Sequence, residues 1–237
     1  MAPIEEKGTL WVFDRDDGDW TWSKVQPDPG SPYPVGRSYH ALTSNGRDTI
    51  FLHAGCPEKG RLGDLWAFNT ATKKWTELAP APEPARGGTS IAYHDGKIYR
   101  MNGFDGKTEQ GGALDVFDIA SNTWTTINYP ADGIQGPSPR SVACLLPLNI
   151  NGKPSLVTMF GEHDPSSLGH QGAGKMLSDI WAFDIQSKGW EKVTVDGETP
   201  PGRGWFDADV VDGASVVVHG GLAESNERLG DVWLLQF

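Results

Sequence analysis

The sequence is poor in cysteine, in positive charge and in long apolar runs. Its 237 residues include two cysteines, Cys56 and Cys144, which have no metal-binding or redox spacing, so we expect free thiols in a reduced, cytoplasmic protein. Lys and Arg number 20 against 31 Asp and Glu, and the formal charge of -11 argues against nucleic acid or an anionic membrane as partner. No run of 18 apolar residues occurs, and the first residues lack the basic and apolar parts of a secretory signal. We therefore expect no membrane span.

Glycine and proline, in contrast, are abundant. The 30 glycines and 17 prolines are spaced along the chain, which indicates many tight turns between short strands. Ten tryptophans and nine phenylalanines supply material for a core. The composition predicts an all-β protein.

An internal repeat organises the chain. An aromatic residue is followed at a fixed distance by Trp in the segments WVFDRDDGDW (11–20), WAFNTATKKW (66–75), VFDIASNTW (116–124) and WAFDIQSKGW (181–190), and DVWLLQF (231–237) begins a further copy. Upstream of the later copies lie Arg37, Arg86, Arg140 and Arg203, at intervals of 49, 54 and 63 residues. Each interval holds further β-rich runs that end in Gly, which predicts four short strands per unit.

These units resemble the kelch family, whose repeats combine a hydrophobic strand ending in Gly-Gly with an aromatic residue and a Trp. His219-Gly220-Gly221 keeps the double Gly, whereas the other units keep one, as in Ala54-Gly55. The resemblance implies a single kelch-type β-propeller over residues 1–237. Its units are expected at about 37–78, 86–127, 140–193 and 203–237, with N-terminal strands within 9–25.

The blade count follows from the strands. Three units are complete and the fourth lacks its outermost strand, so the segment 20–25 is expected to close the last blade and remove an unpaired edge. Four blades are favoured, with five or an incomplete six as alternatives. A homo-oligomer is expected if the ring is incomplete.

The longest insertion, 161–179, carries polar chemistry. Glu162, His163, Asp164 and His170 fall within nine residues, and carboxylate with imidazole is a ligand set suited to Fe(II). The alternative, favoured from these residues alone, is that the Asp and Ser side chains cap backbone amides in a loop bent at its glycines.

The segment GEHDPSSLGHQGAG, with the later HGGLAESNERLGDVW, resembles the nitrile-specifier and thiocyanate-forming (epithiospecifier-type) kelch proteins. Those proteins use Fe(II) to direct breakdown of glucosinolate aglycones. Their iron motif of Glu, Asp and His at spacings of four aligns with Glu162, Ser166 and His170. Ser166 departs from the pattern, and Asp164 or His163 is the candidate replacement ligand.

The blade-start arginines are candidate binding residues. A closed ring would bring Arg37, Arg86, Arg140 and Arg203 around one mouth of the channel, where guanidinium groups suit a small anionic ligand. The resemblance implies the same role for Arg37 and Arg86, and Trp205 is expected to wall an apolar pocket or to plug the channel. The alternative is that each Arg bridges blades through an Asp or a backbone carbonyl.

Three functions remain open at this point. The first is an iron-dependent, specifier-type protein with Glu162, His170 and Asp164 at the metal, in which a Lewis-acidic iron would act on an anionic sulfur-containing substrate. The second is a kelch module that binds a protein partner without chemistry. The third is a shortened or engineered propeller. The catalytic residues are not assigned.

Overall fold

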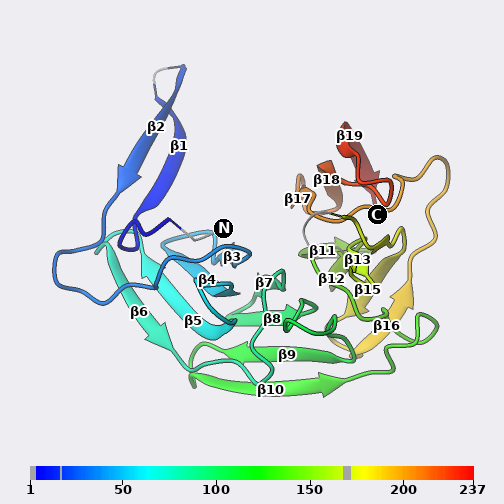
Figure 1. Ribbon diagram of the computed structural model, residues 1–237, viewed down its shortest axis with the longest axis horizontal. Coiled ribbons are helices and arrows are strands. Elements are labelled where there is room, and N and C mark those ends of the chain that lie inside the picture. Colours follow the sequence, from blue (N-terminus) through cyan, green and yellow to red (C-terminus); the bar gives the residue numbers. More distant parts are fainter. Residues whose placement is uncertain (1–3, 17, 168–171) are drawn as a thin grey trace.

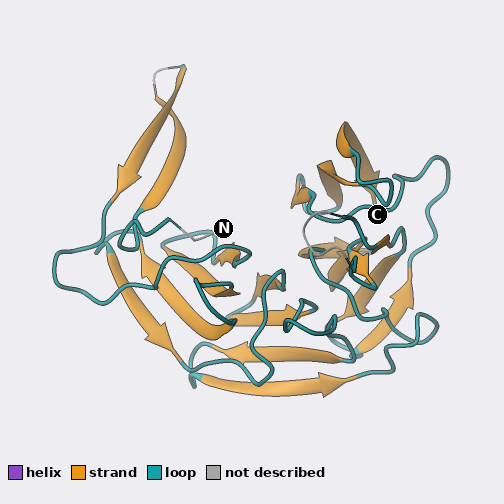
Figure 2. Cartoon of the chain, viewed as in Figure 1, coloured by secondary structure: helices purple, strands orange, loops and turns teal. Residues whose placement is uncertain are grey.

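The computed structural model describes residues 4–16, 18–167 and 172–237, and in this part of the chain all regular structure is β-strand (Figure 2). None of the described segments is a helix of the length and apolarity needed to cross a membrane. The all-β prediction is confirmed.

Four antiparallel sheets form the blades of a β-propeller, as predicted. Blade 1 contains β3 (Ala41–Ser44), β4 (Thr49–Gly55), β5 (Leu62–Asn69) and β6 (Lys74–Leu78). Blade 2 contains β7 (Ser90–His94), β8 (Lys97–Met101), β9 (Ala113–Asp118) and β10 (Thr123–Asn128). Blade 3 contains β11 (Cys144–Ile150), β12 (Lys153–Met159), β15 (Ile180–Asp184) and β16 (Gly189–Lys192). Blade 4 has three strands, β17 (Asp207–Val210), β18 (Ser215–Leu222) and β19 (Arg228–Gln236).

The blades are arranged as an arc around a common axis (Figure 1). The first strand of each blade lies on the inner side of the arc, so that β3, β7, β11 and β17 line the centre. The aromatic strands β5, β9, β15 and β19 lie farther out. This placement brings side chains that are distant in sequence around one hollow.

Alternation along the third strand of each blade builds the core. In β5, Trp66 and Phe68 point toward the N-terminal side of the arc, whereas Leu65 and Ala67 pack on Phe117 of blade 2. The same alternation recurs at the later contacts, where Leu114 meets Phe183 and Ile180 packs with Val218. Each blade therefore has one face for the preceding unit and another for the following one.

The N-terminal hairpin corrects one prediction. β1 (Leu10–Asp16) pairs with β2 (Asp19–Val25) in a separate two-stranded sheet, so the segment 20–25 does not complete blade 4. Leu10 and Val25 pack against Trp66 and Trp75 of blade 1, at the opposite end of the arc from β19 (Figure 1). The hairpin matches β5–β6 in sequence, and local packing onto blade 1 holds it there. The described ring is therefore open between the hairpin and blade 4.

A backbone connection joins the blades near the axis. The residues two positions after the four arginines have positive φ, and their amides are linked in series: Gly88 N donates to Tyr39 O at 2.9 Å, Val142 N to Gly88 O at 2.9 Å and Trp205 N to Val142 O at 3.2 Å. These bonds run from blade to blade. They fix the spacing of the inner strands.

Candidate functional site

The blade-start arginines are held inside their own blades. Arg203 donates to both carboxylate oxygens of Asp231, at 2.7 and 2.8 Å, and to Gly220 O at 2.8 Å. Its side chain is fully buried, and its partners lie on the second strand, β18, and the third strand, β19. This is a bidentate Arg–carboxylate pair, and its two charge-assisted hydrogen bonds are stronger than hydrogen bonds between neutral groups.

Arg37 and Arg140 make the same contact. Arg37 meets Asp64 at 2.6 and 2.8 Å, and Arg140 meets Asp179 at 2.8 and 3.2 Å. In each case the Asp lies two residues before a Trp whose indole N–H donates to the same carboxylate, at 2.8 Å for Trp66 and 2.7 Å for Trp181. The Asp-x-Trp spacing, present three times in the sequence, was a signal that could have identified these partners.

Arg86 departs from this pattern. Ala113 stands where the other blades have Asp, so Arg86 donates to two carbonyl oxygens, Pro84 O and Asn102 O, each at 3.1 Å. The side chain is buried, and this burial, together with the nearby charge of Arg100, lowers its pKa to about 10.

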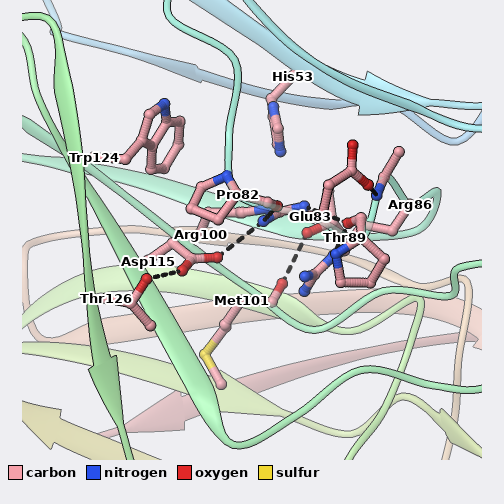
Figure 3. Close-up of polar contacts among 12 residues, drawn as sticks. His53, Pro82, Glu83, Arg86, Thr89, Arg100, Met101, Asp115, Trp124 and Thr126 are labelled. Carbon is pink, nitrogen blue, oxygen red and sulfur yellow. Dashed lines mark hydrogen bonds and ion pairs between the residues drawn. The ribbon is translucent and has the colours of Figure 1, made fainter.

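The carboxylate of blade 2 lies two residues farther along β9. Asp115 takes the place of the blade Trp and pairs with Arg100 at 2.9 Å, while Thr126 donates to its other oxygen at 2.7 Å (Figure 3). Arg100 also donates to Pro82 O at 2.9 Å and is fully buried. A buried ion pair thus replaces the apolar Leu and Trp pair that blade 1 has at the same register, Leu52 and Trp66.

These contacts bear directly on the predicted ring of arginines. The ion pairs of Arg37, Arg140 and Arg203 direct their guanidinium groups between strands of one blade. The partners are the Asp side chains and backbone carbonyls of the alternative given above, but these contacts lie within one blade. The blades themselves are joined by the arginine carbonyls, since Gly103 N donates to Arg140 O and Gly161 N to Arg203 O, both at 2.8 Å. A role in substrate binding stays a prediction.

The long insertion lies between β12 and β15, the second and third strands of blade 3. It contains the short strands β13 (Glu162–His163) and β14 (Lys175–Met176). Glu162 is buried, and one of its carboxylate oxygens accepts a hydrogen bond from Gly174 N at 2.7 Å. The Nδ1 atom of His163 lies 2.7 Å from Pro139 O, and its Nε2 atom lies 3.4 Å from Asp164.

The structure describes three of the four predicted metal ligands, Glu162, Asp164 and Ser166. Asp164 is exposed and Ser166 is half-buried, whereas His170 lies outside the described residues. Across the described ranges, no three His, Cys, Asp or Glu side chains are grouped as metal ligands would be. Glu109 of the neighbouring blade belongs to the same region: its burial, and then the charges of Glu162 and Asp164, raise its pKa. The described donors do not by themselves fit an iron site.

A hollow of about 970 Å³ opens at the axis. It is lined by the inner strands of all four blades, with apolar side chains that include Leu42, Ile91, Leu145 and Phe206. Phe206 lies on this wall and packs edge-on against Phe160, whereas the predicted wall residue, Trp205, belongs to the backbone connection described above.

The charges of the hollow are acidic. Asp207 and Asp209 lie on its blade 4 side and are exposed. His40 lies on the blade 1 side, and desolvation of its ring, followed by the charge of Arg37, lowers its pKa. The lining therefore presents negative charge beside an apolar wall, a combination that suits a cationic or amphipathic ligand.

Comparison with known proteins agrees with the repeat geometry. Residues 4–153 match the KLHDC2/KLHL20/DRC7 Kelch-repeats domain. The chain belongs to the kelch-repeat family. Its propeller architecture and its aromatic repeats are thereby accounted for together.

Individual kelch relatives have diverse names. The chain is 25% identical to N-(sulfonatooxy)prop-2-enimidothioate sulfolyase of Thlaspi arvense, over 94% of this chain and 68% of the relative. It is 28% identical to Host cell factor homolog hcf-1 of Caenorhabditis elegans and 22% identical to Multiple epidermal growth factor-like domains protein 8 of Mus musculus. Those matches cover 90% and 97% of this chain but 28% and 8% of the relatives, so the chain spans a small part of them.

Proposed function

We propose that this kelch protein is a binding module whose axial hollow takes a basic, partly apolar segment of a protein partner. The observation that carries the proposal is the lining of the hollow, where Asp207 and Asp209 stand beside Leu42 and Phe206. A hollow of about 970 Å³ has the size of a ligand pocket. Apolar contact would supply affinity, and the carboxylates would select for Lys or Arg.

The blade contacts support a cationic rather than an anionic ligand. Three of the four predicted anion-binding arginines are paired with carboxylates inside their blades, so their charges are compensated. The total charge of -11 would attract a basic segment from a distance. Added salt would screen this charge and weaken the attraction.

Titration calorimetry tests this function. A short peptide with alternating Lys and Leu is the probe, and a peptide with Glu in place of Lys is its control. We expect the basic peptide to bind and the acidic one not to bind. We also expect Asp207→Asn with Asp209→Asn to weaken binding about tenfold or more, whereas Asp196→Asn, in an exposed loop outside the hollow, leaves it unchanged. Equal binding of both peptides, or of all variants, would reject the proposal.

A second candidate is an iron-dependent specifier-type activity on a small anionic sulfur compound. The sulfolyase similarity over 94% of the chain favours it, as does the buried carboxylate of Glu162 at the start of the insertion. Anaerobic Fe(II) titration is the test, on wild type, Glu162→Gln and His170→Ala. One Fe(II) site per chain that both variants weaken would support it, and absence of Fe(II) binding by the wild type would leave the binding module.

A further inference from the structure

One end of the arc exposes an aromatic surface. Trp11, Phe13, Trp20 and Trp22 project from the same side of the β1–β2 hairpin and are 54%, 50%, 61% and 65% exposed. Phe13 stacks between Trp20 and Trp22, with ring centroids 5.0 and 4.7 Å away. We call these four residues the hairpin face. Single exposed aromatics are ordinary on a protein surface, but a contiguous group of four indicates an interaction site.

The hairpin face repeats a motif that is buried elsewhere in this chain. The Phe13–Trp20 pair, at 5.0 Å, corresponds to Phe68–Trp75 at 5.0 Å in blade 1. In blade 1 those two residues are 0% and 3% exposed, because they pack against the hairpin that precedes them. The hairpin face is therefore a blade surface whose preceding neighbour is not supplied by the described chain.

The other end of the arc exposes the complementary surface. Val232 and Leu234 of β19 are 67% and 59% exposed, with Val217 opposite Leu234 in the sheet. We call these three residues the blade-4 face. The corresponding residues of β5, Leu65 and Ala67, pack on the following blade, and Leu65 is fully buried there. Thus the blade-4 face is a surface built for a following unit.

We propose that a second copy of this chain supplies the missing neighbour, with the hairpin face of one copy packed on the blade-4 face of the next. The two faces are the two halves of the contact that the chain already makes between consecutive blades. They lie at opposite ends of the open arc (Figure 1), so a partner copy presents the required half without any rearrangement within either chain.

The geometry makes the association head-to-tail. Because different surfaces meet, each added copy leaves one face of each kind free, and growth continues unless the rotation closes a ring. The association is therefore expected to depend on concentration and to extend beyond a dimer.

Light scattering after size-exclusion chromatography tests the proposal on the full chain. The wild type is expected to rise in mass with concentration. Trp20→Ser with Trp22→Ser removes the hairpin face, Val232→Asp with Leu234→Asp removes the blade-4 face, and each double variant is expected to run as a monomer. Ile134→Ser, a change at an 82% exposed apolar residue in the loop before Arg140, is the matched control and should associate like the wild type.

Mixing the two double variants separates this contact from any other. Each retains one intact face, so an equimolar mixture should form a dimer that cannot grow, with one copy of each variant. Circular dichroism and urea unfolding of each variant establish that it is folded. A wild type that stays monomeric at every concentration, double variants that associate as the wild type does, or a mixture of folded variants that forms no dimer would each overturn the proposal.

Discussion

Arg203 and Asp231 form a two-pronged ion pair in which the guanidinium is fully buried and the carboxylate is 35% exposed. The hydrogen bond from Arg203, followed by that from Trp233, holds the pKa of Asp231 well below its usual range. The pair joins the start of blade 4 to its third strand. Arg37 and Arg140 repeat this arrangement in blades 1 and 3, so the pair is a structural unit of the repeat.

Replacing the carboxylate tests that unit. Asp231→Asn leaves Arg203 buried without its counter-charge, and we expect a loss of roughly 1–3 kcal/mol of unfolding free energy at pH 7. The wild-type pKa of Asp231 is lower folded than unfolded, so its contribution is present above about pH 4 and is lost as the pH falls further. Urea unfolding at pH 7 and pH 3 should show the difference between wild type and variant shrinking at the lower pH.

The matched control is Asp196→Asn, which changes an exposed carboxylate in a loop. It should unfold at the same urea concentration as the wild type. An Asp231→Asn protein as stable as this control would mean that the ion pair contributes nothing to the blade.

His53 gives the chain a pH dependence in another range. Its ring is fully buried, Nδ1 lies 2.7 Å from Asp64 O, and burial, followed by the charges of Arg100, Arg86 and Arg37, lowers its pKa to about 3. Between about pH 6.5 and 3 the unfolded chain binds a proton that the folded chain does not. Stability should therefore fall as the pH drops below 6.5, by up to ~1.4 kcal/mol per pH unit from this group.

The corresponding positions of blades 2 and 3 carry Met101 and Met159, so His53→Met is the variant of choice. We expect this variant to reduce the change of the urea unfolding midpoint with pH between pH 6.5 and 4. His219→Met, at an exposed ring in blade 4, should keep the wild-type slope. An unchanged slope in His53→Met would assign the pH dependence to other groups.

Much of the fold could be predicted because it depends on the spacing of residues that are close in sequence. The aromatic-to-Trp intervals fixed β5–β6, β9–β10 and β15–β16, and the hydrophobic runs before Gly fixed the second strands. Ring closure could not be predicted in this way. It depends on whether β2 meets β19 across the whole chain, and the packing of Leu10 and Val25 on blade 1 decided against it.

The partners of the blade-start arginines were harder to predict, for a related reason. An Arg at a blade start has the same sequence context whether it faces the axis or turns toward a carboxylate in its own blade. The decisive partner, such as Asp231 for Arg203, lies 28 residues away and is recognised once the strand register is known. The acidic lining likewise depends on β17 being an inner strand, which places Asp207 and Asp209 at the hollow.

Blade 2 offers a gain of stability. Arg86 is buried without the Asp that its counterparts have, and Ala113 occupies that position. Ala113→Asp should restore the pair, raise the pKa of Arg86 and add about 1 kcal/mol of unfolding free energy, because the guanidinium is already desolvated. Urea unfolding is the measurement. Ala113→Asn has nearly the same size without the charge, so an equal effect of both changes would exclude ion pairing as the cause.

A glycine at the end of the second strand of each blade allows close contact with the start of the same blade. Gly161 has φ of 100°, and Gly55, Gly103 and Gly221 have similar values at the corresponding positions. Gly161 N donates to Arg203 O at 2.8 Å, and a methyl group at Gly161 would lie 2.8 Å from Ser141 O. An alanine there combines an unfavourable backbone conformation with a steric conflict against the main chain at the start of the same blade, where Ser141 and Glu162 exchange backbone hydrogen bonds at 2.9 Å.

We therefore expect Gly161→Ala to lower the unfolding free energy by roughly 2–3 kcal/mol, measured by urea unfolding. Gly230→Ala is the control, since this exposed glycine of β19 has an ordinary φ and open space around its Cα. Its stability should stay within about 0.5 kcal/mol of the wild type. If both variants unfold alike, the close contact between Gly161 and Ser141 relaxes freely and blade 3 does not require a glycine at this position.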